Sequence, residues 1–84
     1  LKDLPPVKNR TLQAEPEDGE LPEDYQPVTI AESSVELPVL SVSQAVMQME
    51  LAHIDHLVFR SAIHGGVNIV HRREDGHIGW LDPE

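Results

Sequence analysis

Two short stretches rich in apolar residues, 67–70 and 78–81, enclose a polar segment near the end of the chain. Such stretches on either side of turn residues are typical of paired β-strands. Within the polar segment, the pair Asp75-Gly76 has the residues that tight hairpin turns prefer, because glycine adopts positive φ freely and aspartate tolerates it. A two-residue turn at 75–76 therefore predicts a β-hairpin in which Val70 lies opposite Leu81.

Residues 57–63 predict a further strand, followed by a turn around residues 64–66. A two-residue turn at 65–66 would place Phe59 on one face with polar residues of the next strand. A three-residue loop at 64–66 places Phe59 with apolar residues instead and pairs Ile63 with Val67. Because a slip of one residue moves every side chain to the other face, the apolar pattern favours the three-residue loop.

A helix is predicted from about Val42 to Ala52. Its apolar residues recur at positions i, i+3, i+4 and i+7, which form one helical face. Ser41 and Gln44 have the spacing of a capping box at the start of a helix. Residues 35–39 alternate in polarity and predict a short strand before the helix, confined to a sheet edge because Pro38 lacks a backbone N–H.

These elements predict an α+β fold, a small βαβββ unit with one helix packed on a short antiparallel sheet. On this register one sheet face carries Leu57, Phe59, Ile63, Val67, Ile69, Ile78 and Trp80. The opposite face carries Val58, Ala62, Val70 and Leu81, bordered by Arg60 and Arg72. A single helix covers only one face, and a contiguous apolar patch on the other usually marks an interface. The unit is also small for a stable core, so we expect it to pair as a homodimer.

Composition divides the chain of 84 residues into two parts. Residues 1–36 contain nine acidic against three basic residues and five of the seven prolines, without sustained periodicity. Residues 37–84 contain six acidic against three basic residues and all five histidines. We therefore expect an acidic, proline-rich flexible linker at 1–34 and a folded domain at 35–84. The short run at 27–30 is expected to form a strand only where a partner strand adds an edge.

Charge and missing residue types exclude several classes of function. The formal net charge of −9 argues against nucleic acid, DNA included, as a partner of the isolated chain, because phosphate binding depends on lysine and arginine. The chain has no cysteine, which excludes disulfides and fits a cytoplasmic location. No apolar run is long enough to span a membrane, and no secretory leader is visible.

The region from Val39 to Pro83 resembles a known family. The matching residues are the helix from Ser41 to Leu51, the run Val58-Phe59-Arg60, the run Asn68-Ile69-Val70, and Arg72-Arg73-x-Asp75-Gly76-x-x-Gly79. In order and spacing they are similar to the C-terminal domain of long-form ribosome hibernation promoting factors, the sigma-54 modulation or S30EA ribosomal proteins. That family usually has glycine where His53 stands, an aromatic residue at His56 and Leu57, and tyrosine at His71.

The resemblance implies a bacterial, non-enzymatic interaction module. In the family an N-terminal domain binds the small ribosomal subunit, and the C-terminal domain dimerises so that two idle ribosomes pair. Translation is thereby silenced under stress. The alternative is a monomeric adaptor that docks on ribosomal RNA or protein and holds single idle ribosomes. By analogy residues 1–36 correspond to the linker, and the ribosome-binding domain is not part of this sequence.

Two sets of candidate site residues follow. The expected dimer interface consists of His56, Val58, Arg60, Val70, Arg72 and Leu81. A basic strip that would contact the ribosome in the alternative consists of Arg60, Arg72 and Arg73. Clustered histidines also predict that protonation near pH 6 weakens dimerisation.

Metal binding and catalysis are not predicted. On this register His71 and His77 lie on opposite faces of the hairpin, so they do not converge as zinc ligands must. The serines lack the Gly-x-Ser-x-Gly context of a hydrolase nucleophile, and Asp75 is required by the turn. We expect no cofactor, no metal and no enzymatic activity.

Overall fold

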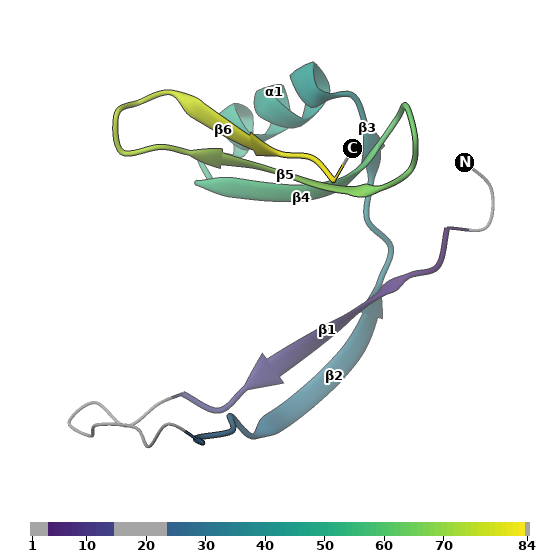
Figure 1. Ribbon diagram of the computed structural model, residues 1–84, viewed down its shortest axis with the longest axis vertical. Coiled ribbons are helices and arrows are strands. Elements are labelled where there is room, and N and C mark those ends of the chain that lie inside the picture. Colours follow the sequence, from purple (N-terminus) through teal and green to yellow (C-terminus); the bar gives the residue numbers. More distant parts are fainter. Residues whose placement is uncertain (1–3, 15–23, 84) are drawn as a thin grey trace. The chain divides into compact units, whose positions relative to one another are not determined.

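The computed structural model describes residues 4–14 and 24–83 of the chain. These residues form two compact units, one of residues 4–5 and 37–83 and the other of residues 6–14 and 24–36. The larger unit contains the elements β3, α1, β4, β5 and β6, and the smaller contains β1 and β2 (Figure 1). Each unit is described below by itself.

Helix α1 (Val42–Ala52) begins and ends as its sequence dictates. At its start the Ser41 Oγ accepts the backbone N–H of Gln44 at 3.2 Å, and the Gln44 side chain accepts the Ser41 N–H at 2.9 Å. This reciprocal capping box satisfies two donors that the first helical turn leaves without partners. At its end His53 adopts the left-handed conformation with φ of 55°, and its N–H bonds to helix carbonyls. The predicted helix and its cap are confirmed.

The sheet of the larger unit has four strands in the order β3-β4-β5-β6. Strand β3 (Val39–Leu40) runs parallel to β4 (His56–Ser61), so that α1 is the crossover of a βαβ unit. Strands β5 (Val67–Arg72) and β6 (Ile78–Leu81) follow as antiparallel hairpins. Figure 1 shows α1 lying across one face of this sheet. The predicted α+β fold with βαβββ order is confirmed.

The core lies between α1 and the sheet. Ala45 and Met49 from the helix, Phe59 from β4 and Val70 from β5 are all fully buried. Partly buried apolar side chains surround them, namely Leu40, Val42, Val46, Leu57 and Ile78. We call the sheet surface that carries Phe59 and Val70 the helix face.

The predicted register between β4 and β5 is wrong. Phe59 lies opposite Asn68, and Val58 lies opposite Ile69. The ladder closes where the Ser61 N–H donates to the Gly66 carbonyl at 2.9 Å, so the loop comprises residues 62–65 rather than 64–66. This loop is held by its own bonds, including one from the Ile63 N–H to the Ser61 hydroxyl. The hydrogen bonds within this loop therefore stabilise the observed register more than the pairing of apolar residues would stabilise the predicted one.

The register of the last hairpin is wrong by one residue. Val70 lies opposite Trp80, and Ile69 lies opposite Leu81. Residues 74–76 form the loop, with a turn closed by the Gly76 N–H on the Arg73 carbonyl and a φ of 89° at Gly76. This is a type I turn followed by a glycine in the left-handed region, an alternative to the two-residue turn that the same sequence accommodates.

The strand predicted at residues 35–39 is divided in two. Val35 ends β2 (Thr29–Val35), and β3 begins only at Val39. Pro38 lies between them and contributes its carbonyl, which accepts the Arg60 N–H at 2.8 Å. A proline is tolerated there because no donor is required from it.

The smaller unit is a two-stranded antiparallel ribbon of β1 (Val7–Leu12) and β2. The sequence predicted no sustained element over most of this range, and the run at 27–30 needed a partner edge that β1 provides. Lys8 and Arg10 flank Glu32 across the ribbon at 3.3 and 3.7 Å. The register shifts after Thr11, which leaves Ile30 as a bulged residue. Whether residues 1–34 act as a linker stays a prediction.

Candidate interaction surface

The sheet has a second face that α1 does not cover, which we call the uncovered face. Directly paired residues of antiparallel strands share a face, and residues two positions apart along a strand do so as well. The uncovered face therefore comprises Val39, His56, Val58, Arg60, Val67, Ile69, His71, Arg73, His77, Gly79 and Leu81. Arg73 and His77 extend the β5–β6 ladder by one pair, through the Arg73 N–H on the His77 carbonyl at 2.8 Å.

An apolar row crosses the middle of the uncovered face. Val58, Ile69 and Leu81 lie directly opposite one another on three adjacent strands. Backbone hydrogen bonds join Arg72 to Asp55 and Ser61 to Gly66 in the β4–β5 ladder. Because hydrogen-bonded and non-hydrogen-bonded pairs alternate along such a ladder, Val58 and Ile69 form a non-hydrogen-bonded pair. Side chains approach most closely in such pairs. Leu81 remains 56% exposed and Val67, next along β5, 38% exposed.

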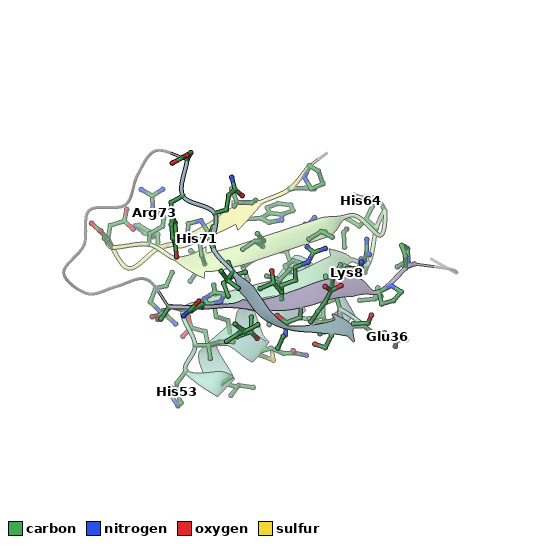
Figure 2. All side chains as sticks on the ribbon, turned by 90° about the horizontal axis from the view of Figure 1, so that it is seen from below. Lys8, Glu36, His53, His64, His71 and Arg73 are labelled. Atoms are coloured by element: carbon green, nitrogen blue, oxygen red, sulfur yellow. The ribbon has the colours of Figure 1, made fainter. Side chains whose placement is uncertain are left out.

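Basic and imidazole side chains flank the apolar row at one end. His56 lies opposite His71, and His71 lies opposite Gly79. The His71 ring lies over Gly79, because a Cβ built at that position would overlap its Nε2 and Cε1 atoms. Glycine is therefore required there for the imidazole to lie flat on the ribbon. Figure 2 shows His71 and Arg73 near one end of β5 and His64 beyond the other end.

Four of the six residues predicted for a dimer interface lie together on the uncovered face. These are His56, Val58, Arg60 and Leu81. The other two do not. Val70 is fully buried against α1, and Arg72 points to the helix side, where it binds Glu50. Their placement on the outer face was wrong, because the β4–β5 loop differs from the predicted length and thereby inverts β5.

The sequence prediction missed Ile69 and Val67 as members of the exposed face. No local signal in the sequence identifies them, since β5 is apolar at positions 67, 69 and 70 and both of its faces look suitable for a core. In the structure, the polar residue between them, Asn68, faces the helix. It is almost fully buried on the helix face, where its side chain accepts the Trp80 indole N–H at 2.8 Å and donates to the Gly66 carbonyl.

The three arginines of the predicted basic strip are all engaged within the chain. The Arg72 guanidinium lies 3.2 Å from Glu50 and 3.7 Å from Asp55, and its bond to Glu50 raises its pKa. Arg73 pairs with Asp75 at 3.0 Å, and that bond, with the His77 N–H, lowers the pKa of Asp75. Arg60 donates to the backbone carbonyls of Gly65 and Pro5, at 3.2 and 2.8 Å.

The histidines are distributed differently from the prediction. His71 and His77 share the uncovered face instead of lying on opposite sides of the hairpin. His64 lies in the β4–β5 loop, where its Nδ1 accepts the Gly66 N–H and its Nε2 meets Asp82 at 3.1 Å. Among residues 4–14 and 24–83, no three metal-ligating side chains gather closely enough to hold an ion.

Comparison with known proteins identifies relatives of the chain. A model of the Sigma 54 modulation/S30EA ribosomal protein C terminus matches residues 24–79. A ribosome hibernation promotion factor of Bradyrhizobium diazoefficiens is 48% identical over 69 residues, which cover 82% of this chain and 34% of that protein. A second ribosome hibernation promotion factor, of Rhizobium meliloti, is 43% identical over 77 residues, which cover 90% of this chain and 40% of that protein. A third, of Deinococcus radiodurans, is 36% identical over 58 residues, which cover 69% of this chain and 30% of that protein.

The chain thus spans between a third and two-fifths of the length of the two rhizobial relatives. None of these three names is that of an enzyme. In the described part of the chain, no helix has the length and apolar character needed to cross a membrane. The match covers α1, β3, β4, β5 and the first two residues of β6, and it confirms the resemblance found in the sequence. The chain belongs to the Sigma 54 modulation/S30EA ribosomal protein family, through its C-terminal region.

Proposed function

We propose that residues 37–83 form the homodimerisation module of a ribosome hibernation factor, and that two copies associate through the uncovered face. The observation that carries this proposal is the row of Val58, Ile69 and Leu81 across three strands, on the sheet face opposite the one that packs on α1. Apolar side chains aligned on a flat sheet face are normally packed against a second layer. A second copy supplies that layer by the same residues.

The small core of the unit supports the same proposal. Among the described residues, the apolar side chains that are fully buried are Ala45, Met49, Phe59 and Val70. Such a core is marginal for a domain of this size without a disulfide or a metal. Burying the uncovered face between two copies adds a second apolar layer and stabilises both subunits.

The relatives are named for promoting ribosome hibernation, and we propose the same role for the protein that contains this chain. A dimeric C-terminal module holds together two ribosome-bound copies, and it thereby pairs or stabilises inactive ribosomes under stress. A cytoplasmic location follows from that role. The module itself acts by association and requires no catalytic group.

The monomeric adaptor is the competing outcome. It requires free cations for phosphate contacts, whereas Arg72 and Arg73 are each paired with a carboxylate in the structure. No observation on this unit favours it specifically. It is therefore distinguished by the same experiment that tests the dimer.

Sedimentation equilibrium of the full chain tests the proposal. We expect twice the mass of one chain, and we expect Ile69→Glu and Val58→Glu to give one chain mass with the native circular dichroism spectrum. Leu51→Glu is the matched control, since Leu51 is 74% exposed on the outer side of α1 and its replacement leaves the dimer intact. A wild-type chain that stays monomeric at all concentrations overturns the proposal. Equal dissociation by Leu51→Glu would place the interface on the helix instead.

A further inference from the structure

The charged and titratable side chains of the uncovered face are all basic. It carries three of the five histidines, His56, His71 and His77, together with Arg60 and Arg73. None of the residues assigned to this face is an aspartate or glutamate. The chain as a whole has a net charge of −9, so this face differs in sign from the rest of the molecule.

The histidines lie close to one another and to the apolar row. His56 and His71 form a non-hydrogen-bonded cross-strand pair, the arrangement in which side chains come closest. His77 lies diagonally across the ribbon from His71, opposite Arg73. Protonation of these rings therefore places like charges beside one another, which destabilises a cross-strand pair.

Two carboxylates close to these groups, Asp75 and Asp55, already have cationic partners. Asp75 accepts bonds from the Arg73 guanidinium and from the His77 backbone N–H. Asp55, next to His56 in sequence, lies 3.7 Å from Arg72, which also binds Glu50 of the helix packed on the other face. The bond from Arg73 lowers the pKa of Asp75, so this carboxylate is already ionised throughout the range from pH 7.5 to 5.5. New positive charge on the uncovered face is thus not matched by new negative charge between pH 7.5 and 5.5.

We infer that the uncovered face is an acid-sensitive interface, in which protonation of His56, His71 and His77 separates two copies of the chain. This inference rests on the proposed homodimer. Imidazole side chains gain their charge across the pH range just below neutrality. Because a symmetric interface is formed by the same surface patch of both copies, each added charge is present twice there and is repelled by Arg60 and Arg73 of both copies.

The test compares the dimer dissociation constant of the full chain at pH 7.5, 6.5 and 5.5 by sedimentation equilibrium. We expect it to rise at least about tenfold from pH 7.5 to 5.5, since like charges juxtaposed at an interface weaken association strongly. The triple variant His56→Gln, His71→Tyr and His77→Gln removes the charge while tyrosine keeps a ring over Gly79. We expect this variant to dimerise with nearly the same constant at all three pH values.

The matched control is His53→Asn, which removes a histidine at the end of α1, away from the uncovered face, and retains a residue that tolerates positive φ. It must show the wild-type response to acid. A dimer with the same dissociation constant at pH 7.5 and 5.5, a triple variant that still dissociates in acid, or loss of circular dichroism at pH 5.5 overturns the inference alone. Absence of a dimer at pH 7.5 overturns the proposed function as well.

Discussion

Ile69 and Val70 are neighbours in β5, and their side chains lie on opposite faces of the sheet. Val70 is fully buried against Ala45, Met49 and Phe59, whereas Ile69 lies in the apolar row of the uncovered face. Replacing each by alanine therefore separates the stability of one subunit from the association of two. The two substitutions also test the observed register directly. In the register that the sequence pattern favoured, Ile69 would lie on the core face and Val70 on the interface face.

For Val70→Ala the loss comes from the core. Two buried methyl groups are removed, at about 0.8 kcal/mol each, and the cavity left behind adds to this, so we expect a loss of about 2 kcal/mol. For a domain of this size that loss lowers the melting temperature by about 8 to 16 °C. We expect little change in the dimer dissociation constant, provided that the subunit remains folded.

For Ile69→Ala the loss comes from association. A side chain at the centre of an interface costs more than about 1 kcal/mol when truncated, and a symmetric dimer loses it twice. We therefore expect the dissociation constant to rise at least about thirtyfold, since 1.4 kcal/mol corresponds to a factor of about ten. The stability of the isolated subunit should change by less than about 1 kcal/mol, because Ile69 is already partly exposed there.

Denaturant unfolding and sedimentation equilibrium, each over a series of protein concentrations, provide the two readouts. The concentration series is needed because association itself raises the apparent stability of the folded state. The reverse result, with Val70→Ala weakening the dimer and Ile69→Ala lowering subunit stability, would refute the reasoning. It would show that β5 presents Val70 outward.

Three further predictions concern local structure. His53→Gly should stabilise the chain by about 1 kcal/mol, measured by denaturant unfolding, because His53 has a φ of 55° that glycine adopts without strain; an unchanged midpoint would contradict this. Ser41→Ala should cost about 1 kcal/mol by the same measurement, because the bond from the Gln44 N–H to the Ser41 hydroxyl is lost, whereas Ser43→Ala should cost less. Asp75 has a pKa lowered by Arg73, so its contribution is present above its unfolded value of about 3.9 and is lost as the pH falls further. Unfolding between pH 5 and 2 should therefore be less pH-dependent in Asp75→Asn, and an identical slope would exclude the contribution.

The helix could be predicted from the sequence because its determinants are local. The spacing of Ala45 and Met49, the capping pair Ser41 and Gln44, and the left-handed His53 all lie within one short segment. Each of these features acts over three or four residues, and none depends on distant parts of the chain. The observed helix accordingly has the predicted ends.

The β1–β2 ribbon could not be predicted in the same way. Its pairs join residues far apart in sequence, such as Val7 with Val35, and its strands mix polar and apolar residues on both faces. Val35 is still 37% exposed and Ile30 is 63% exposed, so burial leaves no periodic signal in the ribbon. Pairing at long range is determined by the partner strand, which local patterning does not contain.

Most of the predicted interface still lies on one face, although the registers of both hairpins differ from the predicted ones. Both hairpin loops differ from the predicted ones by an odd number of residues, and each such shift turns the following strand over. The two inversions cancel for β6, so Leu81 remains on the same face as Val58, as the pattern predicted. Only β5 is left inverted, which exchanges Val70 and Arg72 for Ile69 and His71. The length of this last loop could not be determined from local sequence, because Asp75-Gly76 accommodates both a two-residue turn and a longer loop with glycine in the left-handed region. A prediction of which face of a small sheet is exposed therefore depends on the loops between its strands more than on the strands themselves.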